Sequence, residues 1–235
     1  MMWLYPPGFF GTRVRGRESG LCFFLSHPVK TYVYIDGFNL YYGAIKGTPY
    51  KWLDLLQMCR KLLPKNEIGK IKYYTAIVSA RPNDREQPVR QQTYLRALAT
   101  IPDLEIVYGQ FLQSTVRMMR ANPLPNGEKF VEIIKTEEKG SDVNIATHMV
   151  HDGHQGLYDV AVIVSNDSDL LEPVRIVRYE LGKPVGMICP HKHPSFALQR
   201  YTSFMKQIRQ GVLRDSQFPA TMKDSVGMFS KPSSW

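Results

Sequence analysis

The sequence is poor in cysteine: it has three cysteines in 235 residues, and no two of them form a CxxC pair. A disulfide-stapled secreted fold is therefore disfavoured, and we expect buried thiols and a reducing compartment, the cytoplasm. No apolar run reaches the roughly 18 to 20 residues that span a bilayer, so no membrane association is expected. The sequence also shows no Gly-rich phosphate loop and no evident Ser-His-Asp or Cys-His arrangement.

Acidic residues are in the minority. The chain has 30 Lys and Arg against 21 Asp and Glu, a formal net charge of +9. A surplus of this sign favours polyanionic partners such as nucleic acid.

Hydrophobic patterning divides the chain into three parts. Residues 1–28 mix aromatics, Gly, Pro and Arg without a period, and we expect a poorly ordered leader there. Regular patterning runs over residues 29–210 and predicts one domain. Residues 211–235 are rich in Ser, Pro and isolated apolar residues, which predicts a flexible tail.

Within the domain, short apolar runs alternate with helical patterns. We expect five buried strands at 32–35, 71–78, 104–108, 160–164 and 185–189. We expect helices at 52–63, 84–99, 141–151, 170–181 and 194–208. This alternation predicts an α/β fold with a mostly parallel five-stranded central sheet covered by helices. Residues 111–136 break the pattern and predict an inserted hairpin or loop.

Carboxylates gather where ligands usually bind in such sheets, at the carboxyl ends of the strands. The first strand ends in Asp36, followed by Gly, Phe and Asn39, and the fourth strand is followed by Asp167 and Asp169. Ser141 is a candidate helix N-cap, and Asp142 then leads an inward-facing apolar stripe. Singly, each acid could be only a cap or a turn residue, but clustered acids repel unless a cation lies among them. The sequence predicts a Mg²⁺ or Mn²⁺ site.

Three segments carry a family resemblance: YVYIDGFNLYYG, EEKGSDVNIA and YDVAVIVSNDSDL, in this order. Together they resemble the NYN domain of the PIN-like nuclease superfamily, near its LabA-like branch, over residues 30–208. The resemblance implies a PIN-like three-layer α/β/α sandwich and a divalent-metal-dependent ribonuclease. The family's acids correspond to Asp36, Asp142, Asp167 and Asp169, and its motif amide to Asn39. One departure is Asn166, where family members often have Gly.

The resemblance also implies a reaction and a partner. The metal, held by Asp36, Asp142 and Asp169, would activate water for in-line attack on an RNA phosphodiester. Asp167 would be a further ligand or hold a metal-bound water, and Asn39 would orient the water or the phosphate. Single-stranded RNA is the expected substrate, and cleavage is expected to be endonucleolytic. Many members of the superfamily also pair or bind other proteins, although no apolar stripe here specifies an interface.

Basic and aromatic side chains near the predicted rim are candidates for holding RNA. The basic candidates are Lys46, Arg81, Arg85, Arg90, Arg117, Arg120, Lys129 and Lys139, and the stacking candidates are Tyr41, Tyr42 and Phe111. Taken singly, each is more simply explained as a solvated charge or a core aromatic. Cys189, His191 and His193 form a CPHKH run, but a closed zinc site needs four ligands, so a plain loop is favoured.

Two other functions compete with the ribonuclease. A non-catalytic RNA-binding or regulatory module would keep the fold and the basic surface without cutting RNA. A small-molecule phosphatase is disfavoured because no DxD nucleophile pair follows the first strand. RNA cleavage by the wild type, compared with Asp36→Asn and Asp142→Asn, distinguishes these alternatives.

Overall fold

The structure is a computed structural model that describes residues 28–122 and 127–235. The leader expected at 1–28 therefore lies, except for its last residue, outside the described residues. Six parallel strands form the central sheet, in the order β3-β2-β1-β6-β7-β8. They are β1 (Val29–Asp36), β2 (Asn66–Thr75), β3 (Leu104–Tyr108), β6 (Val160–Val164), β7 (Val185–Cys189) and β8 (Phe204–Gln207).

The sixth strand corrects the expected count of five. The helix predicted over 194–208 ends early, as α6 (Phe196–Tyr201), and the chain then turns into β8, which pairs with β7. Thr202 already has an extended backbone, and Phe204 packs directly over Gly186. A Cβ at Gly186 would lie 2.2 Å from the Phe204 ring, so this glycine makes room for the extra strand.

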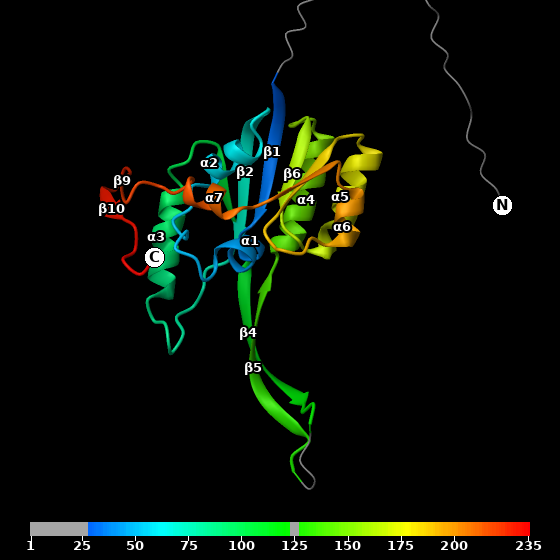
Figure 1. The fold of residues 1–235 in the computed structure, drawn as a ribbon. Coiled ribbons are helices and arrows are strands. Elements are labelled where there is room, and N and C mark those ends of the chain that lie inside the picture. Colours follow the sequence, from blue (N-terminus) through cyan, green and yellow to red (C-terminus); the bar gives the residue numbers. More distant parts are fainter. Residues whose placement is uncertain (1–27, 123–126) are drawn as a thin grey trace, which may run out of the picture.

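Helices cover both faces of the sheet, which gives the three-layer sandwich (Figure 1). One face carries α1 (Gly37–Leu40), the π-helical turn η1 (Tyr41–Ile45), α2 (Leu55–Leu62), α3 (Gln87–Leu98) and α7 (Gln210–Arg214). The other carries α4 (Ser141–His154), the 3-10 turn η2 (Ser168–Leu170), α5 (Leu171–Arg175), the π-helical turn η3 (Ile176–Glu180) and α6.

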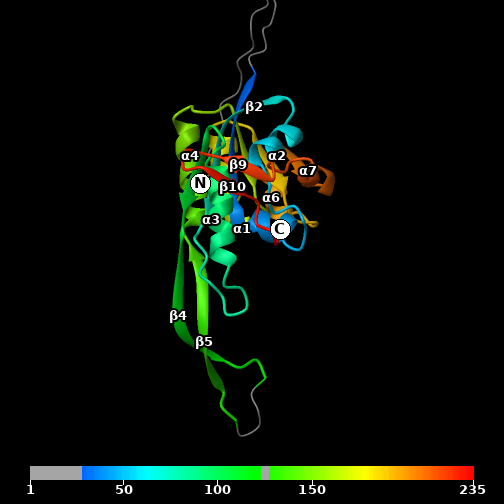
Figure 2. The ribbon, with the colours of Figure 1, turned by 90° about the vertical axis from the view of Figure 1, so that its left-hand side faces the viewer.

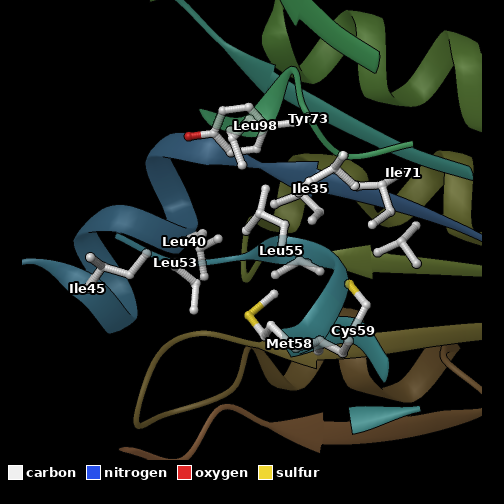
Figure 3. Close-up of a cluster of buried hydrophobic side chains, with 14 of the residues drawn as sticks. Ile35, Leu40, Ile45, Leu53, Leu55, Met58, Cys59, Ile71, Tyr73 and Leu98 are labelled. Atoms are coloured by element: carbon white, nitrogen blue, oxygen red, sulfur yellow. The ribbon is translucent and has the colours of Figure 1, made fainter. Parts of the chain in front are cut away.

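Each layer is held by apolar side chains that face the sheet. Figure 3 shows Leu55, Met58 and Cys59 of α2 against Ile35 of β1 and Ile71 of β2. All five are at most 1 % exposed. A core of this kind fixes the carboxyl ends of β1 and β6 rigidly beside each other.

Strand order reverses between β1 and β6. From β1 the chain proceeds outward through β2 and β3, and the later strands β6, β7 and β8 extend the other way. Ile35 is paired with Val164, so the residues that follow each strand meet at one edge of the sheet. This is the switch point at which open α/β sheets bind ligands.

The expected insertion is a long hairpin, which we call the arm. It consists of β4 (Gln110–Met119) and β5 (Phe130–Lys139), paired from Gln110↔Lys139 to Met119↔Phe130. Figures 1 and 2 show it projecting away from the sandwich. Gly109 and Gly140 form its base; Gly140 has a φ of 102°, and a Cβ on Gly109 would lie 2.3 Å from Glu138 Oε1.

The expectation of a flexible tail from Gly211 onward is wrong, because this segment is folded onto the domain. It forms the rest of α7 and a small hairpin of β9 (Thr221–Lys223) and β10 (Met228–Ser230). Phe218 and Phe229 are buried and pack around Trp52, with ring centroids 5.8 and 6.4 Å from it. Trp52 Nε1 also donates a hydrogen bond to the carbonyl of Pro219. The isolated apolar residues therefore serve as anchors on a single aromatic cluster.

Cys59 and Cys189 are buried and unpaired, as expected, while Cys22 lies outside the described residues. Among the helices of the described ranges, none has the length and apolar character needed to cross a membrane.

Candidate functional site

Asp36 is held in place by the turn that follows β1. It is the N-cap of α1: one carboxylate oxygen accepts a hydrogen bond from the backbone N–H of Asn39 at 2.9 Å, and the other accepts one from Ser165 Oγ at 3.2 Å. Gly37 permits this turn, since a Cβ there would lie 2.6 Å from the Tyr74 carbonyl oxygen. Asp36 is only 6 % exposed, and burial raises the pKa of its carboxyl against the opposing effect of these two hydrogen bonds.

Asn39 joins three segments at this edge of the sheet. Its side-chain oxygen accepts a hydrogen bond from the N–H of Asn166 at 3.0 Å and lies 3.1 Å from His191 Nε2. Asn166 in turn accepts a hydrogen bond from the N–H of Ser195 and donates one to the His193 carbonyl. The Asn that departs from the family pattern thus ties the loop after β7 to the end of β6.

Asp142 lies in the first turn of α4, half-buried. Burial, and then the charges of Asp36, Asp167, Glu138 and Asp169 in that order of size, together raise the pKa of its carboxyl to about 6. Asp36, Asp142 and Asp167 line one cavity together with Glu138. The structure therefore brings together acids that are more than 100 residues apart in the sequence.

Glu138 is an acid that the sequence analysis missed. Its Oε1 accepts hydrogen bonds from both the hydroxyl and the N–H of Ser141, at 2.8 and 3.2 Å. Ser141 was expected to be the N-cap of this helix, but Gly140 occupies that position and Ser141 is the first helical residue. No capping signature in the sequence points to it, because a capping box places the acid three residues after the serine and Glu138 precedes Ser141.

Asp169 does not join this group. Asp167 caps η2 by accepting the N–H of Asp169 at 3.0 Å, and this turn leaves Asp169 exposed and outside the cavity lining. Asp169 also has the smallest of the effects on the pKa of Asp142.

The acidic group fits a hard divalent cation in its chemistry. All of its donors are carboxylate oxygens, which Mg²⁺ and Mn²⁺ prefer, and their mutual repulsion raises the pKa of Asp142. It is not a preformed cage: over residues 28–122 and 127–235, no three His, Cys, Asp or Glu side chains form a group that could hold a metal ion as they stand.

The cavity has a volume of about 620 Å³ and extends from the acids to the amino end of α3. Arg81 and Arg90 line its far side, as does Lys51, which the sequence analysis did not single out. The three stacking candidates, Tyr41, Tyr42 and Phe111, also line it, and so do His191 and Trp235.

The other basic candidates lie around the cavity or on the arm. Lys46 lies 4.8 Å from the Tyr42 ring, and Arg117 lies 4.9 Å from the Phe130 ring. Arg120 and Lys129 pair through their backbones beyond the strand ends, and Lys139 at the arm's base forms an ion pair with Glu137. Arg85 does not line the cavity.

A family model for the NYN domain matches residues 30–206. The chain is 30 % identical to 6-hydroxy-3-succinoylpyridine 3-monooxygenase HspA of Pseudomonas putida over an alignment 239 positions long, which covers 89 % of this chain and 76 % of that protein. Among solved structures, VPA0982 of Vibrio parahaemolyticus, a protein of unknown function, superposes with a TM-score of 0.50 and 18 % identity, over 78 % of this chain and 95 % of its own. That superposition supports the fold alone.

Proposed function

The chain belongs to the NYN domain family, and on that premise we propose that it is a metal-dependent ribonuclease that hydrolyses phosphodiester bonds within single-stranded RNA. The observation that carries the proposal is that Asp36, Asp142, Asp167 and Glu138 line one cavity, where burial and the charges of the other acids raise the pKa of Asp142. Such repulsion is relieved by a cation, and a cation beside a basic cavity suits a phosphodiester substrate.

Asp36, Asp142 and Asp167 are the residues proposed to hold Mg²⁺ or Mn²⁺, with Glu138 as a further ligand or as the support of α4. When bound, the ion would stabilise negative charge on the phosphate and lower the pKa of a water molecule. Asn39, fixed by the N–H of Asn166, orients the reacting groups. Asp169 remains a proposed contributor from the family pattern, through its charge and its N–H bond to Asp167.

The test is cleavage of a labelled single-stranded RNA with Mg²⁺ or Mn²⁺, with and without chelator. We expect Asp36→Asn and Asp142→Asn to lower turnover by at least about a hundredfold, because each removes a proposed metal ligand. Glu67→Gln is the matched control: Glu67 is exposed near the start of β2, at the opposite end of the sheet. Wild-type protein that binds RNA but does not cut it with either metal would instead favour a non-catalytic RNA-binding module.

Similarity to HspA supports a second candidate of another class. The identity of 30 % extends over most of both chains, and that relative is named as a monooxygenase of 6-hydroxy-3-succinoylpyridine. We propose oxygenation of a small aromatic acid as the alternative. It predicts O₂ uptake and a hydroxylated product when the protein is supplied with that pyridine and NADH or NADPH as electron donor. Absence of uptake, together with RNA cleavage, would exclude it.

A cytoplasmic location is part of the proposal, because Cys59 and Cys189 are unpaired thiols in a chain otherwise poor in cysteine.

A further inference from the structure

We propose that the end of the cavity away from the acids is a subsite for a planar ring bearing an anionic group. We call it the basic end and define it by Lys51, Arg81 and Arg90, with the adjacent ring of Tyr41. The inference rests on the proposed function only in taking that ring and anion to be one nucleotide of RNA. The anion itself could be a phosphate or the carboxylate of a small aromatic acid, since both accept the same hydrogen bonds.

The basic end has a surplus of positive charge. Asp84 stands among the three cations, and its pKa is lowered by the hydrogen bond from Arg90 and then by the charges of Arg90, Arg81 and Lys51. Glu86 adds a second negative charge, which acts on Arg90. Arg90 is thereby occupied. Across the part of the chain that the structure describes, no carboxylate lies within ion-pair distance of Arg81 or Lys51. Two cations therefore remain available to an anionic ligand.

The loop that carries Arg81 is held in place before any ligand arrives. The backbones of Arg81 and Asp84 hydrogen-bond to each other in both directions, at 3.3 and 3.0 Å. The side chain of Gln91, on α3, accepts from the N–H of Val78 and donates to the carbonyl of Ala76. Preorganisation of this kind reduces the ordering cost of binding.

Aromatic side chains supply the surface for a ring. Tyr41 lies beside the basic end: burial raises the pKa of its hydroxyl, whereas the charges of Arg90 and Arg81 lower it. Trp235, whose ring centroid lies 6.0 Å from that of Tyr94, lines the same cavity. Phe111 also lines it, but on the side of the acids, since it is paired with Glu138 in the arm. A cavity of about 620 Å³ is in the range that encloses a drug-sized molecule, so it suits one unpaired nucleotide or one aromatic acid.

The two ends of the cavity therefore suit different parts of one ligand. The acids repel an anion unless a cation is bound, while the basic end attracts one without a metal. For RNA, a phosphate next to the reacting one would lie on Arg81 and Lys51, with its base against the aromatic rings. Binding at the basic end is thus separable from catalysis.

The test is calorimetric titration of the full chain in the presence of EDTA. The probes are AMP, adenosine, which has the ring without the anion, and 4-hydroxybenzoate, a small aromatic acid. We expect at least one anionic probe to bind at least about tenfold more tightly than adenosine, and the Lys51→Gln/Arg81→Gln double variant to lose that advantage. Tighter AMP supports the nucleotide source, and tighter 4-hydroxybenzoate supports the small-acid source.

Controls keep the inference apart from the proposed function. Lys65→Gln removes an exposed charge outside the cavity and should bind as the wild type does. Asp142→Asn should retain AMP binding even though it is expected to lower cleavage strongly. Loss of cleavage in this variant therefore does not count against the subsite. Equal affinity of the wild type and a folded double variant for all three probes, or no binding of either anion at millimolar concentration, would overturn the inference. A melting curve establishes that the double variant is folded.

Discussion

Asp142 combines two conditions that oppose ionisation, burial in the first turn of α4 and a set of negative neighbours. Its pKa of about 6 in the folded protein lies above its ordinary value of 3.8. Between these values the folded state holds the proton more tightly than the unfolded chain does. The free energy of unfolding of the metal-free protein should therefore fall as pH rises from about 4 through about 6.

Asp142→Asn should remove this pH-dependent cost. At pH 7.5 in EDTA we expect the variant to be more stable than the wild type by about 1 kcal/mol, a figure discounted because the half-buried group is partly screened by solvent. Near pH 4 the two proteins should have nearly equal stability. Urea denaturation at the two pH values measures the difference; a stability gap independent of pH would contradict the assignment. Mg²⁺ should raise the melting temperature of the wild type more than that of the variant.

A buried ion pair secures the helix that carries Asp142. Lys72 Nζ of β2 lies 2.6 Å from Asp152 Oδ2 of α4, and the Tyr34 hydroxyl of β1 donates to the same oxygen at 2.9 Å. Lys72 and Asp152 are 8 % and 4 % exposed. Burial, and then the charge of Asp152, raises the pKa of Tyr34, so the tyrosine remains a neutral donor. These contacts join α4 to two strands of the sheet.

Removing one partner of this pair should cost more than replacing both. Lys72→Met leaves Asp152 charged and buried, and we expect a loss of about 3 kcal/mol or more in the free energy of unfolding. The double variant Lys72→Met/Asp152→Asn keeps an acceptor for Tyr34 and should recover most of the loss. Chemical denaturation of the two single variants and the double variant tests the coupling, and additive losses would contradict it.

At this scale, position after a strand was enough to predict Asp36 and Asp167 at one edge, because parallel strands end together. Asp142 was predicted from its place at the start of a helix with an inward-facing apolar stripe. Glu138 and His191 were not predictable as site residues. Glu138 lies near the end of β5 and is held at the site by the hydrogen bonds that it accepts from Ser141. His191 reaches the site through Asn39, whose side-chain oxygen lies 3.1 Å from His191 Nε2. Such contacts depend on tertiary structure. Asp169 lies outside the cavity lining because of the 3-10 turn that follows Asp167, and the spacing of residues does not encode the direction of so short a turn.

The arm is the element least supported by the rest of the molecule. Leu112, Met118 and Ile133 are all at least 38 % exposed on one of its faces, and a two-stranded hairpin alone is marginally stable in water. Its outer part therefore adds little to the stability of the sandwich. Its basic residues Arg117, Arg120 and Lys129 lie beyond the middle of the strands, far from the core.

Shortening the arm should separate stability from RNA binding. Replacing residues 116–133 by Asn-Gly joins Thr115 to Ile134, which are already paired, and preserves the hairpin register at the base. We expect a melting temperature within about 2 °C of the wild type, and RNA affinity reduced with a shallower salt dependence because phosphate contacts are lost. Filter binding at two salt concentrations measures the second effect. An unchanged affinity would remove the arm from the RNA interface.

Elements with strong periodicity were predicted well, and the errors came from elements set by neighbours. The strands at 104–108, 160–164 and 185–189 have the predicted bounds because their runs are apolar and β-branched. β8 was read as helix because its four residues follow a true helix without a break in composition. The reason for the strand is a tertiary contact: Gly186 has no side chain, so the Phe204 ring can pack over it when the two residues pair.

For the whole molecule, the chain's last segment completes the core. Phe218, Phe229 and Trp235 surround Trp52, and the Arg96 guanidinium holds Asp224 through two hydrogen bonds of 2.6 and 2.7 Å while stacking on Phe229 at 4.2 Å. The sparse apolar residues of this segment led to the prediction of a flexible tail. The prediction failed because side chains that pack against a tryptophan far away in the sequence leave no periodic pattern.

Phe229→Ala should reduce the free energy of unfolding by about 3 kcal/mol, because it leaves a cavity beside Trp52. Ending the chain after Asp215 should destabilise the protein further, so that no cooperative unfolding transition is seen above room temperature. Phe196→Ala is the control, since Phe196 is 73 % exposed. Thermal unfolding followed by tryptophan fluorescence reports the change, and a truncated protein that melts as the wild type does would restore the view of this segment as a dispensable tail.

The shape of the arm has a mechanical consequence for the acids. Ten-residue strands make it about 33 Å long, and it joins the body at Gly109 and Gly140, next to the contact between Phe111 and Phe38. Gly140, at the base of the arm, lies two residues after Glu138 and two residues before Asp142. A bound molecule that moves the outer ends of β4 and β5 would shift the backbone at Gly140 and alter the spacing of the Glu138 and Asp142 carboxylates.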